Sequence, residues 1–325
     1  MPLPIPKPGE NRNDFVSRCM INPTMTSEYP KEDQRYAICT TLSENKGILN
    51  KKKKRKLSSQ YIKQLKLAEK QNYPVAYRFY MDNYNKGIEM YSQEETANNP
   101  NFSSLFKEKD LKTMYTIIYK QTGLRFYRWY KKNFAMFQKQ ESFNEESAVA
   151  ENLERFAKEK EGYLALAKEV SAVSGVARGE LEKIIRQYMA DPEFMTYGIE
   201  KRTRILTKAL SFKARWMAKR IVRTESTAAA NLGIIQSAEN IFGGDELVKE
   251  WIATFGTRGR PAHQAYSGTV KPLNDPYEIN GSQMQFPGDT NLSASANEIV
   301  NCRCFSAPFV STEAMERQEQ IVRNT

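Results

Sequence analysis

The pattern of apolar and polar positions divides the chain into a long helical part and a shorter part of different character. From about Ser58 to Ile241 apolar residues recur at spacings of three and four, and glycine and proline are sparse, which predicts helices. A small helical module is expected within residues 11–45, after a proline-rich arm. Breaks between helices are expected near Pro74, Asn98–Pro100, Gly123, Ser174–Gly175 and Asp191–Pro192.

The last predicted helix runs from about Lys201 to Ile241 and has the clearest apolar face. Its run Ala228–Ala230 leaves a narrow surface that another backbone can approach closely, and Gly243 and Gly244 are expected to end it. The apolar stripe, at spacings of four, four, three and four, consists of Leu206, Leu210, Ala214, Met217 and Ile221.

Beyond Gly244 short apolar segments alternate with loops rich in Gly, Pro, Asn and Asp. The segments Val248–Phe255, Gln283–Phe286 and Cys304–Val310 predict short strands. The sequence therefore predicts an α+β fold, in which a largely helical N-terminal part and a long helix lead into a small α+β domain. The expected division is an arm and module at 1–45, a basic helical domain at 46–200, the α+β domain with its leading helix at 201–310, and a tail at 311–325.

Composition narrows the class of protein. The 325 residues are 40% hydrophobic, enough for a core, and no apolar run approaches the roughly 20 residues that span a bilayer. The first residues lack the apolar stretch of a secretory signal, so we expect a protein made in the cytoplasm with no membrane partner. The four cysteines are too few for a disulfide framework, and reduced thiols are expected.

Charge is distributed unevenly along the chain. The net charge is +11; residues 1–140 hold 26 basic and 13 acidic side chains, whereas residues 141–325 hold 23 and 25. An excess of positive charge in one part of a chain attracts polyanions, chiefly nucleic acid. Lysine-rich helix faces, however, are often merely solvated. A basic run is a candidate DNA contact, a linker or a polar helix start; it consists of Lys51, Lys52, Lys53, Lys54, Arg55 and Lys56.

Aromatic and basic residues alternate in Met114–Tyr119 and Phe126–Phe134. Such a pattern can form a stacking platform for single-stranded nucleic acid. The aromatic residues recur at spacings of three and four, however, which favours a core between helices.

Several short motifs follow one another between residues 223 and 304. They are Arg223-Thr224-Glu225, Asn231, Trp251, Arg258-x-Arg260-x-x-His263, Pro287-Gly288-Asp289 and Asn301-Cys302-Arg303-Cys304. In this order and at these intervals the set resembles the Mu protein F-like family of phage minor head proteins. The resemblance implies a virion protein of head morphogenesis, present in the host cytoplasm during assembly and attached to the portal protein or the major capsid protein. A role in DNA delivery is among those that the resemblance allows. The basic part, residues 46–140, is the expected DNA-facing or portal-facing surface, and contact with packaged DNA is expected to be non-specific because it rests on lysines.

The charges of the first motif suggest a structural role. Arg223 and Glu225 lie two residues apart on a helix, so each is expected to reach a separate partner in the following domain, within a buried polar network. The alternative is a nuclease or an ADP-ribosyltransferase-like enzyme that uses Glu225, Arg258, Arg260 and His263. We favour the structural role, because the chain has no Gly-rich phosphate loop, no H-E-x-x-H and no G-x-S-x-G; no cofactor is expected.

His263, Cys302 and Cys304 could offer three soft ligands to zinc. Closed structural zinc sites use four ligands, and the chain has no second histidine, so no metal is expected. We instead expect a strand edge at which Asn301 and Arg303 hydrogen-bond the long loops and His263 fixes them.

Overall fold

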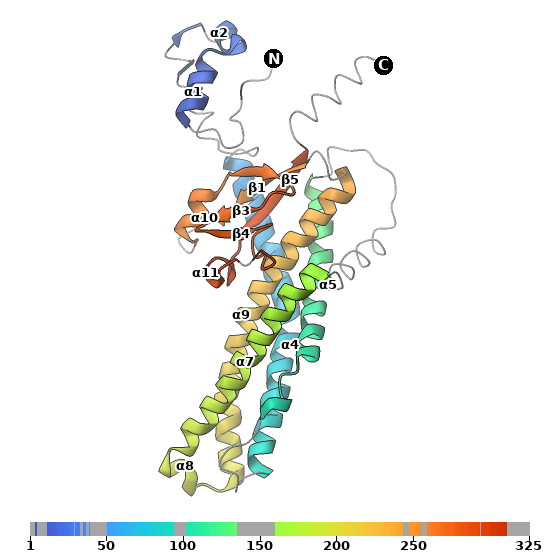
Figure 1. The fold of residues 1–325 in the computed structure, drawn as a ribbon, viewed down its shortest axis with the longest axis vertical. Coiled ribbons are helices and arrows are strands. Elements are labelled where there is room, and N and C mark those ends of the chain that lie inside the picture. The colour runs from blue at the N-terminus through green and yellow to red at the C-terminus, as the bar shows by residue number, and fades with distance from the viewer. Residues whose placement is uncertain are drawn as a thin grey trace.

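A bundle of long helices carries a small sheet unit at one end, so the fold is α+β as predicted (Figure 1). Among the helices that the structure describes, none is long and apolar enough to cross a membrane. The structure, a computed structural model, describes a few positions before residue 40 together with residues 12–28, 51–93, 102–134, 160–242, 247–254, 259–292 and 294–310.

In the part of the chain that the structure describes, four long helices form the bundle: α4 (Lys51–Gln93), α5 (Glu108–Phe134), α7 (Lys160–Met189) and α9 (Ile199–Phe242). The predicted extent of the last helix agrees closely with α9, whose whole apolar stripe is buried. Helix α9 packs along both α4 and α5 and also touches α7. A single core joins these helices across residue 200, so the bundle does not divide there.

Two short helical segments lie between the long helices of the bundle. The turn η1 (Phe102–Ser104) precedes α5, and α8 (Pro192–Thr196) precedes α9. The predicted break at Asp191–Pro192 is confirmed, because the Asp191 carboxylate accepts a hydrogen bond, 3.0 Å long, from the Glu193 backbone N–H and caps α8.

Three predicted breaks are wrong. Pro74 lies inside α4, Gly123 inside α5 and Ser174–Gly175 inside α7. Pro74 is exposed, as is Lys70, whose carbonyl loses its helical donor to the proline and can accept water instead. Packing against neighbouring helices then offsets the local cost of these residues.

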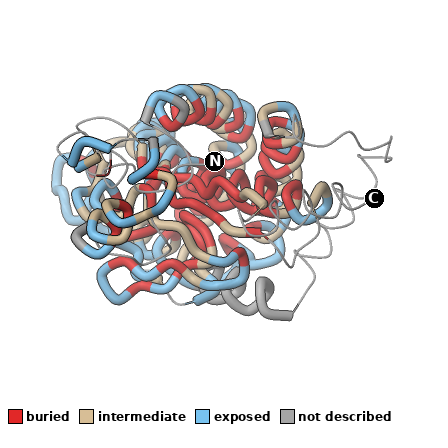
Figure 2. The backbone as a smooth tube through the Cα atoms, turned by 90° about the horizontal axis from the view of Figure 1, so that it is seen from above, coloured by how far each residue is buried: buried red, intermediate tan, exposed pale blue. Residues whose placement is uncertain are grey.

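The bundle has a second core where it meets the sheet. Rings from α4, α5 and the last strand pack together there, with the Tyr61 and Phe305 centroids 4.6 Å apart and the Phe126 and Trp129 centroids 5.8 Å apart. Phe126, Tyr127, Trp129 and Tyr130 are therefore core residues, as their spacing predicted. Figure 2 shows the buried positions concentrated where the elements face one another.

The C-terminal unit contains a three-stranded antiparallel sheet and a hairpin. Strand β1 (Leu247–Ile252) lies between β2 (Val270–Pro272) and β5 (Phe305–Val310). The hairpin pairs β3 (Tyr277–Ile279) with β4 (Ser282–Met284). Two short helices are α10 (Pro261–Tyr266) and α11 (Ala296–Ile299). The three strand segments predicted from the sequence correspond to β1, β4 and β5. Strands β2 and β3 have only three residues each, too few to show the alternation of apolar and polar positions that marks a strand.

The N-terminal module contains α1 (Arg12–Met20) and α2 (Pro23–Glu28). Cys19 and Cys39 form a disulfide, which corrects the expectation that all thiols are reduced. Both cysteines are buried beside Phe15 and Met25, and this local packing brings them together although they are 20 residues apart in sequence. Cys302 and Cys304 are free.

Candidate functional site

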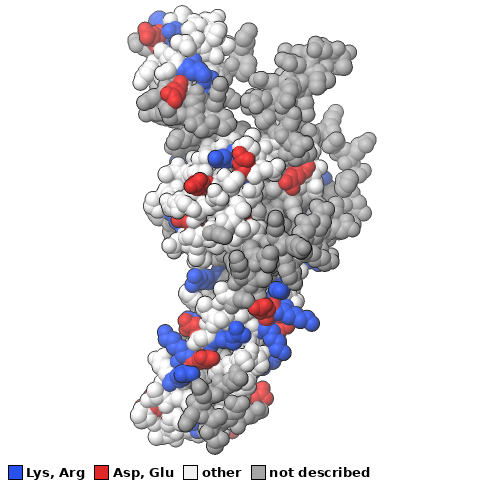
Figure 3. Space-filling model, viewed as in Figure 1, with Lys and Arg blue, Asp and Glu red and all other residues white. Residues whose placement is uncertain are grey.

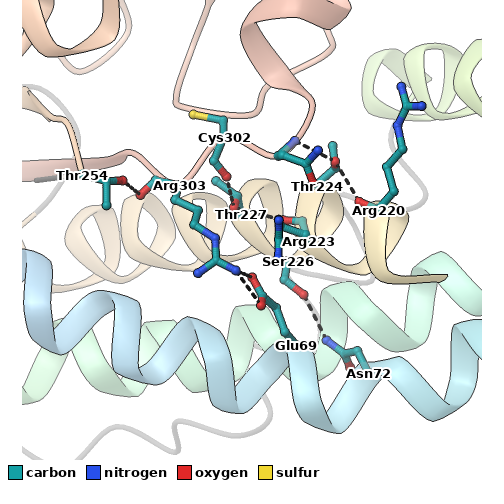
Figure 4. A network of polar contacts seen from close by, with 11 residues as sticks. Glu69, Asn72, Arg220, Arg223, Thr224, Ser226, Thr227, Thr254, Cys302 and Arg303 are labelled. Carbon is teal, nitrogen blue, oxygen red and sulfur yellow. Dashed lines mark hydrogen bonds and ion pairs between the residues drawn. The ribbon is translucent and has the colours of Figure 1, made fainter. Parts of the chain in front are cut away.

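Part of the motif set meets at a buried junction between α9 and the C-terminal unit, and Figure 4 shows Thr224 and Thr227 of α9 beside Cys302 and Arg303. Thr224 and Thr227 lie three residues apart, on one face of α9. The Thr224 hydroxyl oxygen accepts a hydrogen bond from the Asn301 N–H at 3.1 Å, and the Thr227 hydroxyl donates to the Cys302 carbonyl at 2.6 Å. Helix side chains thus bond the backbone of a segment more than 70 residues away.

Asn231 continues the same face one turn further and is fully buried. Its Nδ2 donates to the Pro287 carbonyl at 3.0 Å and to the Cys304 carbonyl at 3.2 Å, and its Oδ1 accepts from the Ser306 N–H at 2.8 Å. One amide therefore connects α9 to both the Pro287–Asp289 turn and the start of β5.

The Pro287–Asp289 turn lies directly against α9. Gly288 has a φ of 90°, and a Cβ there would lie 3.1 Å from the Ala228 backbone nitrogen. The predicted close approach at Ala228–Ala230 is confirmed. Asp289 is buried and holds the turn by accepting hydrogen bonds from the N–H groups of Gln285 at 2.8 Å and Asn291 at 2.9 Å.

The two charged residues of the first motif behave differently from expectation. Arg223 is exposed, so it is not part of a buried network. Glu225 is buried, and it accepts a hydrogen bond at 3.1 Å from the hydroxyl of Tyr119, which belongs to α5 and not to the following domain. A buried polar network does join α9 to the C-terminal unit, but hydroxyl and amide groups form it, because they cost less to bury than charges.

Arg303 attaches the C-terminal unit to α4. Its guanidinium donates to both carboxylate oxygens of Glu69, at 2.7 and 2.8 Å, while its carbonyl accepts from the Thr254 hydroxyl at 2.8 Å. Burial raises the pKa of Glu69, and the charges of Arg303 and Arg223 act in the opposite direction. The expectation that Arg303 bonds a loop holds for its carbonyl, which accepts from Thr254, whereas its side chain pairs with Glu69 of α4. Asn301 donates its N–H to Thr224 of α9 and not to a loop.

A cluster of one imidazole and two thiols occupies the core of the C-terminal unit. His263 Nδ1 lies 3.6 Å from Cys302 Sγ and 3.4 Å from Cys304 Sγ. His263 Nε2 lies 2.7 Å from a Glu298 carboxylate oxygen. A hydrogen bond between the thiols lowers the pKa of Cys302, and that bond together with burial raises the pKa of Cys304.

Trp251 and Arg260 surround this cluster. The Trp251 ring meets the His263 ring edge to face, with centroids 5.3 Å apart. Arg260 immediately precedes α10 and donates to the Val300 carbonyl at 2.5 Å. Arg258, the other arginine of the motif, lies outside the described residues.

The basic run Lys51–Lys56 begins α4, so it is a helix start and not a linker. Lys54 is buried, with its Nζ 2.6 Å from an oxygen of Glu250, a fully buried residue of β1. Lys54 therefore cannot be a DNA contact, whereas Lys52, Arg55 and Lys56 are exposed.

The outer face of α9 is a basic and aromatic surface that the sequence analysis missed. Residues 201–223 contain nine basic side chains and no acidic one. Acidic residues elsewhere in 141–325 cancel this charge, so the net charge of that region did not reveal it. Phe212 and Trp216 are 59% and 53% exposed, and the guanidinium of Arg220 lies over the Trp216 ring at 5.3 Å. We define the α9 stripe as the exposed residues Lys208, Phe212, Arg215, Trp216, Lys219 and Arg220.

The described residues do not form an open catalytic site from the residues of the enzyme alternative. Glu225 and His263 are 4% and 1% exposed and both are engaged, to Tyr119 and to Glu298. A side chain that acts on a substrate must reach it. Comparison with known proteins gave no matching family model, no similar curated protein and no similar solved structure.

Proposed function

We propose that this chain is a minor head protein of a tailed phage, resembling the Mu protein F-like family and acting in head morphogenesis. The observation that carries the proposal is the junction on α9. Motif residues separated by up to about 80 positions contact one another there through backbone and side-chain hydrogen bonds. A chance succession of short motifs has no reason to converge on one packed surface.

The chemistry of the junction supports a structural role over an enzymatic one. Its hydroxyl, amide and carbonyl groups are buried and bonded to each other, which fixes the position of the C-terminal unit on α9. A rigid unit at the end of an elongated bundle suits attachment to a portal or to the inner capsid, which are the partners we propose.

Contact with packaged DNA is the second part of the proposal. The α9 stripe and the exposed residues of Lys51–Lys56 add positive charge to the outside of the bundle. Figure 3 shows lysine and arginine side chains over the visible face of the bundle, with acidic side chains among them. Lysine and arginine bind phosphate without reading sequence, so the contact is expected to be non-specific.

Mass spectrometry of purified particles tests this function. Particles from the phage that encodes the chain are separated by density, their heads are isolated from their tails, and the protein is quantified in each fraction. We expect a few copies per head and none in free tails. Presence in the lysate together with absence from the heads would refute the proposal.

A further inference from the structure

The cluster of His263, Cys302 and Cys304 has the properties of a metal site. The histidine lies on α10 and the cysteines lie just before β5, about 40 residues later, yet their ligand atoms are all within 4.8 Å of one another. The three side chains are only 1%, 2% and 4% exposed. This buried position excludes bulk water from a bound ion and lets the side chains hold a fixed geometry.

The distances match those between zinc ligands. Zinc binds imidazole nitrogen at about 2.0–2.1 Å and thiolate sulfur at about 2.3 Å in tetrahedral geometry, which separates a nitrogen from a sulfur ligand by about 3.5 Å. The two Nδ1–Sγ distances are 3.4 and 3.6 Å.

The surrounding groups orient the ligands. Glu298 accepts from His263 Nε2 at 2.7 Å, which places the ring proton on Nε2 and directs the Nδ1 lone pair toward the thiols. Asn280 Nδ2 holds the other oxygen of Glu298 at 3.0 Å. A carboxylate behind a metal-binding histidine is the usual second layer of a zinc site.

We propose that His263, Cys302 and Cys304 bind one zinc ion. The ion ties α10 to the segment that enters β5 and stabilises the C-terminal unit. Among the described residues, no further histidine, cysteine or carboxylate supplies a fourth ligand. A water molecule therefore takes the fourth coordination position of the ion. The sequence offered only three ligands, which argued against a metal site. The geometry of the three side chains and the contact of His263 with Glu298 now favour one. The inference does not depend on the proposed function.

Metal content of the full chain, purified without a tag, provides the first test. We expect about one zinc per chain by elemental mass spectrometry, and less than a tenth of that in Cys302→Ser and Cys304→Ser. Ser306→Ala is the matched control: Ser306 is buried nearby in β5, and its hydroxyl contacts Tyr277 and not the cluster. Zinc that is absent from the wild type, or retained equally in both cysteine variants, would overturn the proposal.

A second test uses the wild-type protein alone, so its result does not depend on whether the variants fold. The chain is stripped with a chelator and titrated with Co²⁺, whose absorption spectrum reports tetrahedral geometry and thiolate ligation. We expect saturation at one equivalent with both signatures, and displacement by Zn²⁺. Glu298→Gln should keep that stoichiometry but weaken the affinity by about 10–100-fold. A spectrum of octahedral Co²⁺ without thiolate bands would also overturn the site.

Discussion

Small uncharged side chains, not charges, join α9 to the C-terminal unit. Thr227 and Asn231 bond buried backbone carbonyls, and Thr224 bonds the backbone N–H of Asn301. A buried backbone group without a hydrogen bond costs about 1–3 kcal/mol, so Thr227 and Asn231 each have a large effect on stability. The neighbouring Arg223 is exposed, although it belongs to the same sequence motif.

Asn231→Ala should destabilise the protein by about 2–4 kcal/mol, because it leaves the Pro287 and Cys304 carbonyls and the Ser306 N–H without this partner. Chemical unfolding monitored by circular dichroism measures the change. Asn240→Ala, on an exposed position of α9, is the control and should change stability by less than about 0.5 kcal/mol. Equal effects of the two substitutions would contradict the role of Asn231.

Lys249 is a fully buried lysine at the centre of the sheet, in β1. Its Nζ donates to the Gln285 carbonyl at 2.7 Å and lies 5.0 Å from the Tyr277 ring centroid. Burial lowers the pKa of Lys249 to about 7, although the nearby charge of Asp289 acts to raise it. In the unfolded chain a lysine has a pKa of about 10.4.

This difference predicts a pH dependence of stability. Between pH 7 and about 10 the unfolded state holds a proton that native Lys249 has lost, so the free energy of unfolding should rise with pH across this window. Lys249→Met should remove that rise and raise stability at pH 7 by about 1–3 kcal/mol. Urea unfolding of both proteins from pH 7 to 9.5 makes the comparison. Parallel curves for the two proteins would contradict the prediction.

At the scale of elements, Gly233 of α9 lies directly against the backbone of Gly123 in α5. A Cβ on Gly233 of α9 would lie only 2.3 Å from the Gly123 carbonyl oxygen of α5. The two backbones therefore lie so close together that no side chain at Gly233 would fit between them. Gly123 was predicted to break a helix, but it lies inside α5 and its backbone contacts α9.

Gly233→Ala should destabilise the protein by about 3 kcal/mol, because α9 and α5 must separate to admit the methyl group. Gly179→Ala is a matched control: Gly179 lies in α7 with open space around it, and the change should stabilise by about 0.5–1 kcal/mol. Thermal unfolding of both variants measures the difference. A neutral Gly233→Ala would show that the helices are not in close contact.

At the scale of the whole molecule, positive charge lies along the outside of the bundle. The α9 stripe contributes four exposed basic residues, and its two aromatic rings contact guanidinium groups, Arg215 over Phe212 at 4.7 Å and Arg220 over Trp216. Because no acidic residue lies within 201–223, this part of the surface attracts a polyanion more strongly than the net charge alone indicates.

DNA binding should be steeply salt-dependent, and the double variant Lys208→Gln/Lys219→Gln should lower the slope of log affinity against log salt by about 2. Lys109→Gln/Lys183→Gln removes the same charge from exposed positions on α5 and α7 and should leave the slope nearly unchanged. Fluorescence anisotropy with duplexes of two unrelated sequences measures both effects. Identical slopes in the two variants would show that the α9 stripe is not the contact.

The sequence by itself determined the helical character of the region before residue 242, the extent and apolar stripe of α9, three strands and the change of character near residue 244. Each of these follows from a local period or a local stop signal. Only the tertiary structure decided that Pro74 and Gly123 lie within helices, and that Arg303 pairs with Glu69, 234 positions away. It alone brought His263 to the two cysteines. Contacts between segments distant in the chain leave no local period, since they depend on how whole elements pack.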